Sequence, residues 1–232
     1  MTYGGLRVLG AGVLAMICAW AGARIYMNWQ ARSGAEMHAP AGLASAPTPA
    51  DEAADLDVAT LPPRIPDKLP DFSLSNLDGK STPISTWAGR PLVINFWATW
   101  CAPCRREIPL LNTLAGEWAS QDDVAVVGIA VDHRDQVSQF AAQFKIGYPL
   151  LVGEEDALDV AAKFGVASPA FPFTVFTDRR GDVVALFVGE LHRKQADLIM
   201  SVVQNLNKGS VQLVQARRQI AQGLDALAEK TS

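Results

Sequence analysis

The feature that most constrains the fold of this chain is a pair of cysteines, Cys101 and Cys104, that closely follows a largely apolar run. The run, residues 91–97, predicts a buried strand, and residues 102–118 carry apolar side chains at helical spacing. At such a junction the first sulfur lies over the helix N-terminus, where unpaired N–H groups and the helix dipole stabilise a thiolate. Because the thiolate is the reactive species in disulfide exchange, the pair predicts a redox site.

Composition limits the alternatives. The 232-residue chain has only one further cysteine, Cys18, which excludes a disulfide-stapled scaffold and leaves a zinc site short of ligands. Its three histidines, His38, His133 and His192, do not repeat at metal-ligand spacing. The net charge of −4 provides no basic field for nucleic acid. We therefore expect a packed domain that binds no metal, organic cofactor or nucleic acid.

The N-terminus predicts a membrane anchor. Leu6 to Met27 is almost wholly apolar and is interrupted only by Arg7 and Arg24 near its ends. A bilayer span needs roughly 17–25 residues, and terminal arginines can reach the headgroups. We expect residues 1–29 to be a signal anchor with the amino terminus inside. A cleaved signal peptide is the alternative, because Ala21-Gly22-Ala23 resembles a cleavage site.

The rest of the chain divides into three parts. Residues 30–67 are rich in Ala and Pro without a hydrophobic period, which predicts a tether. Residues 68–207 alternate between β-rich runs and helices, which predicts an α/β fold with a central mixed β-sheet flanked by helices. Residues 208–232 form a C-terminal extra helix over 211–228. Its narrow apolar stripe favours docking on its own domain, with a dimer or partner helix as the alternative.

The expected elements follow from hydrophobic periodicity. The residues 72–77 predict an edge strand, and 124–131 is apolar throughout, as in a strand covered on both faces. The other expected strands are 92–97, 148–152, 173–177 and 183–188, and the expected helices are 102–118, 135–144, 156–164 and 193–206.

Two segments resemble a known family. The first is Asn95-Phe96-Trp97-Ala98-Thr99-Trp100-Cys101-Ala102-Pro103-Cys104-Arg105, continued by Glu107-Ile108-Pro109. It is similar to the active-site segment of the thioredoxin superfamily, and most resembles the membrane-anchored TlpA/ResA/CcmG-like thiol-disulfide oxidoreductases. The second, 172–181, resembles the cis-proline strand and hairpin of that family. The resemblance covers about Leu69 to Leu206 and implies a thioredoxin-like fold.

The resemblance also implies roles for individual residues. Cys101 would attack a substrate disulfide, and Cys104 would resolve the mixed disulfide. The cis-proline would be Pro172, with Pro169 as the other candidate. The expected supporting and substrate-binding residues are Trp100 covering the site, Pro103 shaping the first helical turn, Phe171 with backbone free to pair with a substrate strand, and Pro172.

One position departs from cytoplasmic thioredoxins, which carry a buried Asp in the strand before the motif. Here the position is Asn95, as in the tethered branch. Since Asn95 takes no proton, another group or a water must assist Cys104. Asp132 and Glu154 are candidates for that group, and we place Glu107 on the helix surface or in a structural role.

The function implied is an extracytoplasmic protein-disulfide reductase. The resemblance places it in the bacterial inner membrane as a single-pass protein with its catalytic domain in the periplasm. Its partners would be protein substrates bearing disulfides and a transmembrane thiol reductase as electron donor. Its duty would be cytochrome c maturation or reduction of copper-site cysteines.

Three alternatives remain open. A thiol peroxidase of the same fold would carry a Pro and a Thr where this chain has Ile94 and Ala98. A copper-binding module would use Cys101, Cys104 and a His such as His133, but such carriers space their cysteines one residue wider. The third alternative is a purely structural thiol pair.

Overall fold

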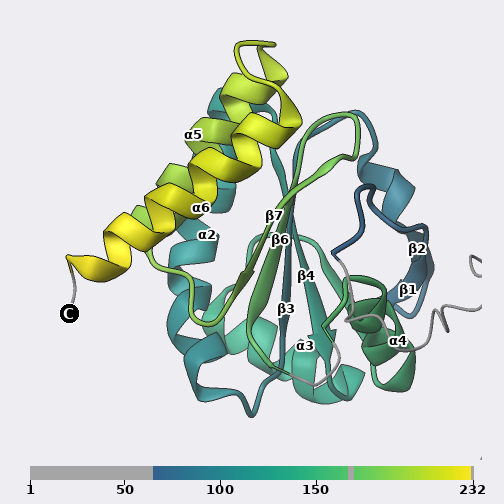
Figure 1. Ribbon diagram of the computed structural model, residues 1–232. Coiled ribbons are helices and arrows are strands. Elements are labelled where there is room, and N and C mark those ends of the chain that lie inside the picture. Colours follow the sequence, from purple (N-terminus) through teal and green to yellow (C-terminus); the bar gives the residue numbers. More distant parts are fainter. Residues whose placement is uncertain (1–64, 167–169, 231–232) are drawn as a thin grey trace, which may run out of the picture. The chain divides into compact units, whose positions relative to one another are not determined.

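The computed structural model describes residues 65–166 and 170–230 (Figure 1). The expected anchor, nearly all of the expected tether, and Pro169 lie outside these residues. Among the helices of the described part, none combines the length and the apolar character that a bilayer crossing requires.

The centre of the domain is a seven-stranded mixed sheet in the order β2-β1-β5-β4-β3-β6-β7. Strands β3, β4 and β5 run parallel, and the other neighbours pair antiparallel. The strands are β1 (Ser73–Asn76), β2 (Ser81–Pro83), β3 (Leu92–Trp97), β4 (Ala125–Val131), β5 (Leu150–Gly153), β6 (Phe173–Thr177) and β7 (Val183–Val188). The prediction that β1 lies at the edge is wrong, because the short β2 pairs along its outer side.

Helices cover both faces of this sheet, as predicted. They are α2 (Ala102–Asp122), α3 (Arg134–Phe144), α4 (Glu155–Lys163), α5 (Arg193–Asn207) and α6 (Leu213–Glu229), with a short 3₁₀ helix η2 (Ile84–Trp87). Side chains of α2, α3, α5 and α6 share one core cluster on one face, and those of α4 and η2 belong to the cluster on the other. Strands β3 and β4 are therefore buried along their whole length.

The sheet order explains where chemistry can occur. Strand β3 ends at Trp97, and α2 begins at Ala102 after a turn closed by a hydrogen bond from Cys101 N to Ala98 O of 3.2 Å. Strand β6 lies antiparallel beside β3, with Phe173 opposite Phe96. The start of β6 therefore meets the end of β3, and Pro172 arrives next to the dithiol turn.

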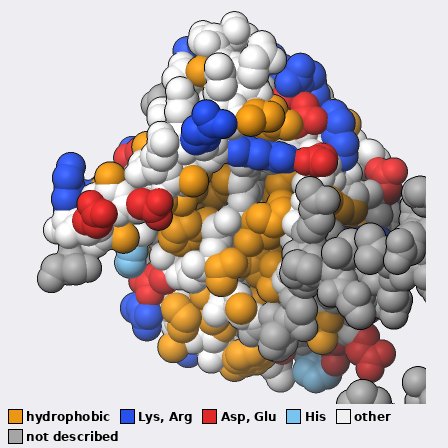
Figure 2. Space-filling view, in the orientation of Figure 1, with side chains coloured by type: hydrophobic (Ala, Val, Ile, Leu, Met, Phe, Trp, Pro, Cys, Tyr) orange, Lys and Arg blue, Asp and Glu red, His pale blue; other side chains and the backbone are white. Residues whose placement is uncertain are grey.

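The C-terminal helix α6 docks on its own domain, as predicted. It packs against α5 and β7, and its Ala216 and Ile220 are buried (Figure 1). Arg217 of α6 donates to the Val183 carbonyl through Nη2 at 2.6 Å and Nε at 3.1 Å. Beside this contact a groove between β7 and α6 is lined by Leu186, Leu224 and further apolar side chains, which gather on this face in Figure 2.

Candidate active site

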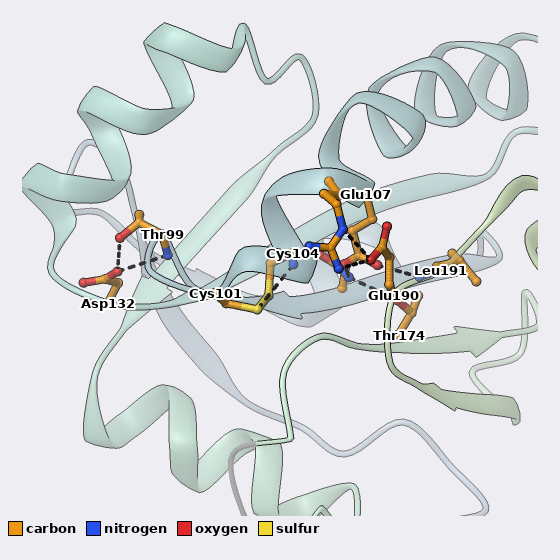
Figure 3. The surroundings of a disulfide bond; sticks show 10 residues. Thr99, Cys101, Cys104, Glu107, Asp132, Thr174, Glu190 and Leu191 are labelled. Atoms are coloured by element: carbon orange, nitrogen blue, oxygen red, sulfur yellow. Dashed lines mark hydrogen bonds and ion pairs between the residues drawn. A yellow bond between two sulfur atoms is a disulfide. The ribbon is translucent and has the colours of Figure 1, made fainter.

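The two cysteines of the motif form a disulfide at the start of α2 (Figure 3). Cys101 is the N-cap of the helix, and its Sγ accepts a hydrogen bond from the Cys104 backbone N–H at 3.3 Å. Pro103 lies in the first turn, where a backbone N–H would have no helical partner. Cys101 is 5% exposed and Cys104 is fully buried. Of the two cysteines, only Cys101, at the helix N-terminus, therefore has any surface exposed to solvent.

A cis peptide bond joins Phe171 to Pro172, which confirms the prediction that Pro172, rather than Pro169, is the cis-proline. The carbonyl of Pro172 accepts from Gly189 N at 2.8 Å, so the loop is tied to the end of β7. The Phe171 ring meets the Trp100 ring edge to face at 6.2 Å, and Trp100 is 65% exposed. An exposed aromatic side chain beside the dithiol turn offers an apolar contact to an approaching chain.

The acid nearest the dithiol along α2 is Glu107, and it is buried rather than on the helix surface. Its Oε1 accepts from Asn95 Nδ2 at 2.7 Å, and its Oε2 accepts from Leu191 N at 2.8 Å. Asn95 Nδ2 also donates to Thr174 Oγ1 at 3.1 Å. Because residues three apart share a helix face, Glu107 lies one turn below Cys104.

Burial changes the acidity of this carboxyl. Loss of solvent raises the pKa of Glu107 from 4.5 to about 7, although the hydrogen bonds from Leu191 and Asn95 act in the opposite direction. The charge of Glu190 raises it further. A carboxyl with a pKa near neutrality can both accept and return a proton under ordinary conditions.

The two acids expected to assist Cys104 have other partners. Asp132 accepts from the backbone N and the hydroxyl of Thr99, and from His133 N at 2.8 Å. Figure 3 shows Asp132 and Thr99 on the side of the disulfide away from Glu107. Glu154 is exposed and pairs with His133 Nδ1 at 2.9 Å. Asp132 thus fixes the turn before the dithiol, and Glu154 contacts His133 at the surface.

A signal for Glu107 was present in the sequence. Glu107 lies three residues after Cys104 and four before Leu111, so it falls on the buried stripe of α2. A surface or merely structural role was the simpler reading of a charged residue. Its burial raises the pKa of this carboxyl to about 7.

The described residues contain no group of three or more His, Cys, Asp and Glu side chains placed to hold a metal ion. His133, the candidate for a copper ligand, has its Nδ1 directed to Glu154.

Comparisons with known proteins agree with this geometry. The AhpC/TSA family matches residues 65–186. The thioredoxin-like protein YneN of Bacillus subtilis (strain 168) is 34% identical over 134 residues, which cover 56% of this chain and 75% of YneN. The thiol-disulfide oxidoreductase ResA of Geobacillus thermodenitrificans (strain NG80-2) is 31% identical over 126 residues, covering 54% of this chain and 70% of ResA.

Among solved structures, a secreted thiol-disulfide isomerase from Corynebacterium glutamicum is similar with a TM-score of 0.54. It is 26% identical, and the match covers 59% of this chain and 85% of the isomerase.

Proposed function

Because the chain belongs to the AhpC/TSA family and is homologous to thiol-disulfide oxidoreductases, we propose that it reduces protein disulfides through Cys101 and Cys104. The observation that carries this proposal is the asymmetry of the pair. Cys101 lies at the helix N-terminus and accepts an N–H bond, whereas Cys104 is fully buried behind it. The first sulfur is placed to ionise and attack, and the second to resolve.

The reaction transfers two electrons to the substrate. The Cys101 thiolate attacks one sulfur of a substrate disulfide, and the other substrate sulfur leaves as a thiolate and takes a proton. Cys104 then loses its proton and attacks Cys101 Sγ. The second substrate thiolate leaves, takes a proton, and the Cys101–Cys104 disulfide remains.

Glu107 is the group we assign to the proton of Cys104. It lies one turn along the same helix face, and burial brings its pKa to about 7. As a carboxylate it would accept the Cys104 proton during resolution, and as a carboxylic acid it would return it when the disulfide is reduced again. Asn95 and Leu191 N hold the carboxyl in place.

Substrate would bind against Trp100 and the loop at Phe171-Pro172. The exposed Trp100 ring provides an apolar contact, and the backbone at Phe171 would pair with an extended segment of the substrate. We place this domain outside the cytoplasm, anchored in the inner membrane and facing the periplasm. The apolar stretch from Leu6 to Met27 and the secreted C. glutamicum isomerase support that placement.

An electron donor is required after each turnover. We propose a transmembrane thiol reductase, with haem attachment or copper insertion as the process that consumes the reduced cysteines of the client. Support for these partners comes from the resemblance of the active-site segment to the tethered branch.

Two measurements on the full chain test the proposal. Equilibration with glutathione gives the reduction potential, and a value near about −250 mV or lower fits a reductant, whereas one near about −120 mV makes the protein an oxidant. The Cys104→Ala variant should accumulate mixed disulfides with clients, while Cys101→Ala should not. Trapping by Cys101→Ala alone would reverse the two roles.

Peroxide consumption is the control reaction. Ala98 is buried, carries no hydroxyl to hold a peroxide, and stands where a thiol peroxidase would have Thr. We expect hydrogen peroxide to be consumed far more slowly than a protein disulfide is reduced. The reverse order would favour the peroxidase alternative.

A further inference from the structure

The loop between β7 and α5 is fastened to the active-site helix at two adjacent points. Leu191 N donates to the buried carboxyl of Glu107 at 2.8 Å. One residue earlier, Glu190 Oε2 pairs with Arg106, at 2.5 Å from Nη2 and 2.8 Å from Nε. Consecutive residues of the helix thus bind consecutive residues of the loop (Figure 3).

This arrangement places an ion pair over a buried acid. The Glu190 side chain is 19% exposed, whereas that of Arg106 is 61% exposed, so the carboxylate lies on the inner side of the pair. We propose that Arg106 and Glu190 are positioning residues that set the proton affinity of Glu107 and, through it, the pH at which Cys104 is activated. The second part rests on the proposed function of Glu107.

Within the described ranges, 65–166 and 170–230, the other groups placed around Glu107 are uncharged. Asn95 of β3 and Thr174 of β6 are neutral side chains, and Cys104 of α2 is in the disulfide. Burial and the Glu107 charge raise the pKa of Tyr148, which precedes β5, so its hydroxyl keeps its proton. Hydrogen bonding to Glu190 raises the pKa of Arg106, which therefore stays charged.

The two charges act on Glu107 in opposite directions. A nearby carboxylate disfavours ionisation of a second carboxyl, and a nearby guanidinium favours it. Removing the charge of Glu190 should make Glu107 more acidic. Removing the charge of Arg106 leaves Glu190 uncompensated and should make Glu107 less acidic. If the pair only fastened the loop, either substitution would release the same contact and the two effects would have the same sign.

The test measures the Glu107 titration by carboxyl-carbon NMR in the oxidised full chain. We expect its pKa to fall by about 0.5–1 unit in Glu190→Gln and to rise by a similar amount in Arg106→Gln. Arg193→Gln is the matched control. Arg193 also links the start of α5 to α2, through an ion pair of 2.9 Å with Glu117, which lies ten residues beyond Glu107 on that helix. It should leave the Glu107 titration unchanged.

Shifts of the same sign in both variants, or no shift in either, would overturn the proposal. Amide spectra that match wild type show that the two substitutions leave the fold intact. The proposed function fails separately. If the NMR shifts occur as expected but the pH profile of disulfide exchange does not follow them, the ion pair acts on Glu107 and Glu107 does not serve Cys104. A different outcome separates the two ideas the other way. The pH profile of disulfide exchange could follow the Glu107 titration in wild type and lose that dependence in Glu107→Gln, while the Glu107 pKa in both ion-pair variants stays at its wild-type value. In that case the proposed function stands and only the role of the ion pair is refuted.

Discussion

Replacement of Glu107 by Gln should remove a part of the pH dependence of the unfolding free energy of the oxidised protein. In the unfolded chain this carboxyl has its ordinary pKa of 4.5, and in the folded chain burial raises it to about 7. The folded state therefore holds the proton more tightly. The resulting stabilisation is complete below about pH 4.5 and is lost as the pH rises to about 7.

The magnitude follows from the separation of the two pKa values. Each unit corresponds to 1.36 kcal/mol, so a separation of about 2.5 units is worth about 3 kcal/mol. The side chain is 1% exposed, so solvent screening hardly reduces this value. Desolvation raises the pKa of Glu107, and the two hydrogen bonds from Asn95 and Leu191 N lower it. Desolvation prevails because both hydrogen bonds come from neutral donors.

Urea unfolding of wild type and Glu107→Gln between pH 4.5 and pH 8 provides the measurement. The difference in unfolding free energy should shift against wild type by about 3 kcal/mol between about pH 4.5 and 7, then level off. In the Glu107→Gln variant, the side-chain NH2 group faces one of the two N–H groups that donate to the Glu107 carboxyl in wild type. This unfavourable contact costs about 1–3 kcal/mol at every pH. This constant offset does not alter the pH dependence.

Glu107→Leu serves as a second variant. It removes the same titration but has a different offset, so its difference curve should run parallel to that of Glu107→Gln. A flat difference would show that burial does not perturb the carboxyl. A difference that grows in favour of wild type as the pH rises would show that the two hydrogen bonds prevail over desolvation.

Further predictions concern packing and substrate contact. Gly128→Ala should lower the free energy of unfolding in urea by about 1–3 kcal/mol, because the new Cβ would lie 2.6 Å from Leu150 Cδ2. Gly116→Ala, at a position on α2 with open space around it, should instead raise the free energy of unfolding by about 0.5–1 kcal/mol. Phe164→Ala should cost about 3–5 kcal/mol in the same assay, since the ring is fully buried and meets Phe96 edge to face at 5.6 Å. Trp100→Ala should slow reduction of a protein disulfide about tenfold or more but leave reaction with dithiothreitol unchanged, as stopped-flow kinetics would show.

The strands and helices of the domain were predictable where the hydrophobic pattern is compatible with only one type of secondary structure. Strand β4 is apolar throughout and is covered on both faces, and the limits of β6 and β7 match the predicted ranges. The position of β1 was not predictable from its own residues. Its neighbour β2 has only three residues, of which two are exposed, so no periodicity announces it.

The cis-proline and the dithiol were found from local segments because their chemistry is local. A cysteine at a helix N-terminus and a proline before a strand each depend on neighbours within a few residues. Their proximity across space depends on the pairing of β3 with β6, which the register of Phe96 with Phe173 shows.

The expectation that Asp132 or Glu154 assists Cys104 has a physical reason. Asp132 and Glu154 follow parallel strands whose ends meet at the edge of the sheet that carries the dithiol, so topology alone favours them. Topology does not reveal that Thr99 and His133 donate hydrogen bonds to Asp132, or that the Glu154 side chain is exposed to solvent. It also does not reveal that Leu191, 84 residues beyond Glu107, supplies the backbone N–H that makes burial of this carboxyl tolerable.

Under the proposal that Glu107 exchanges the proton of Cys104, Asn95 and Glu107 together serve the buried thiol although the strand itself carries no acid. An aspartate in β3 would combine proton exchange and anchoring to the sheet in a single side chain. Here the two tasks are divided, because Asn95 holds the carboxyl from the strand while Glu107 supplies it from the helix. A carboxyl on α2 moves with Cys104, and it is also open to influence from the loop that contacts α2. The reduction chemistry of this domain should therefore respond to substitutions at Arg106 and Glu190, whose ion pair joins α2 to the loop before α5.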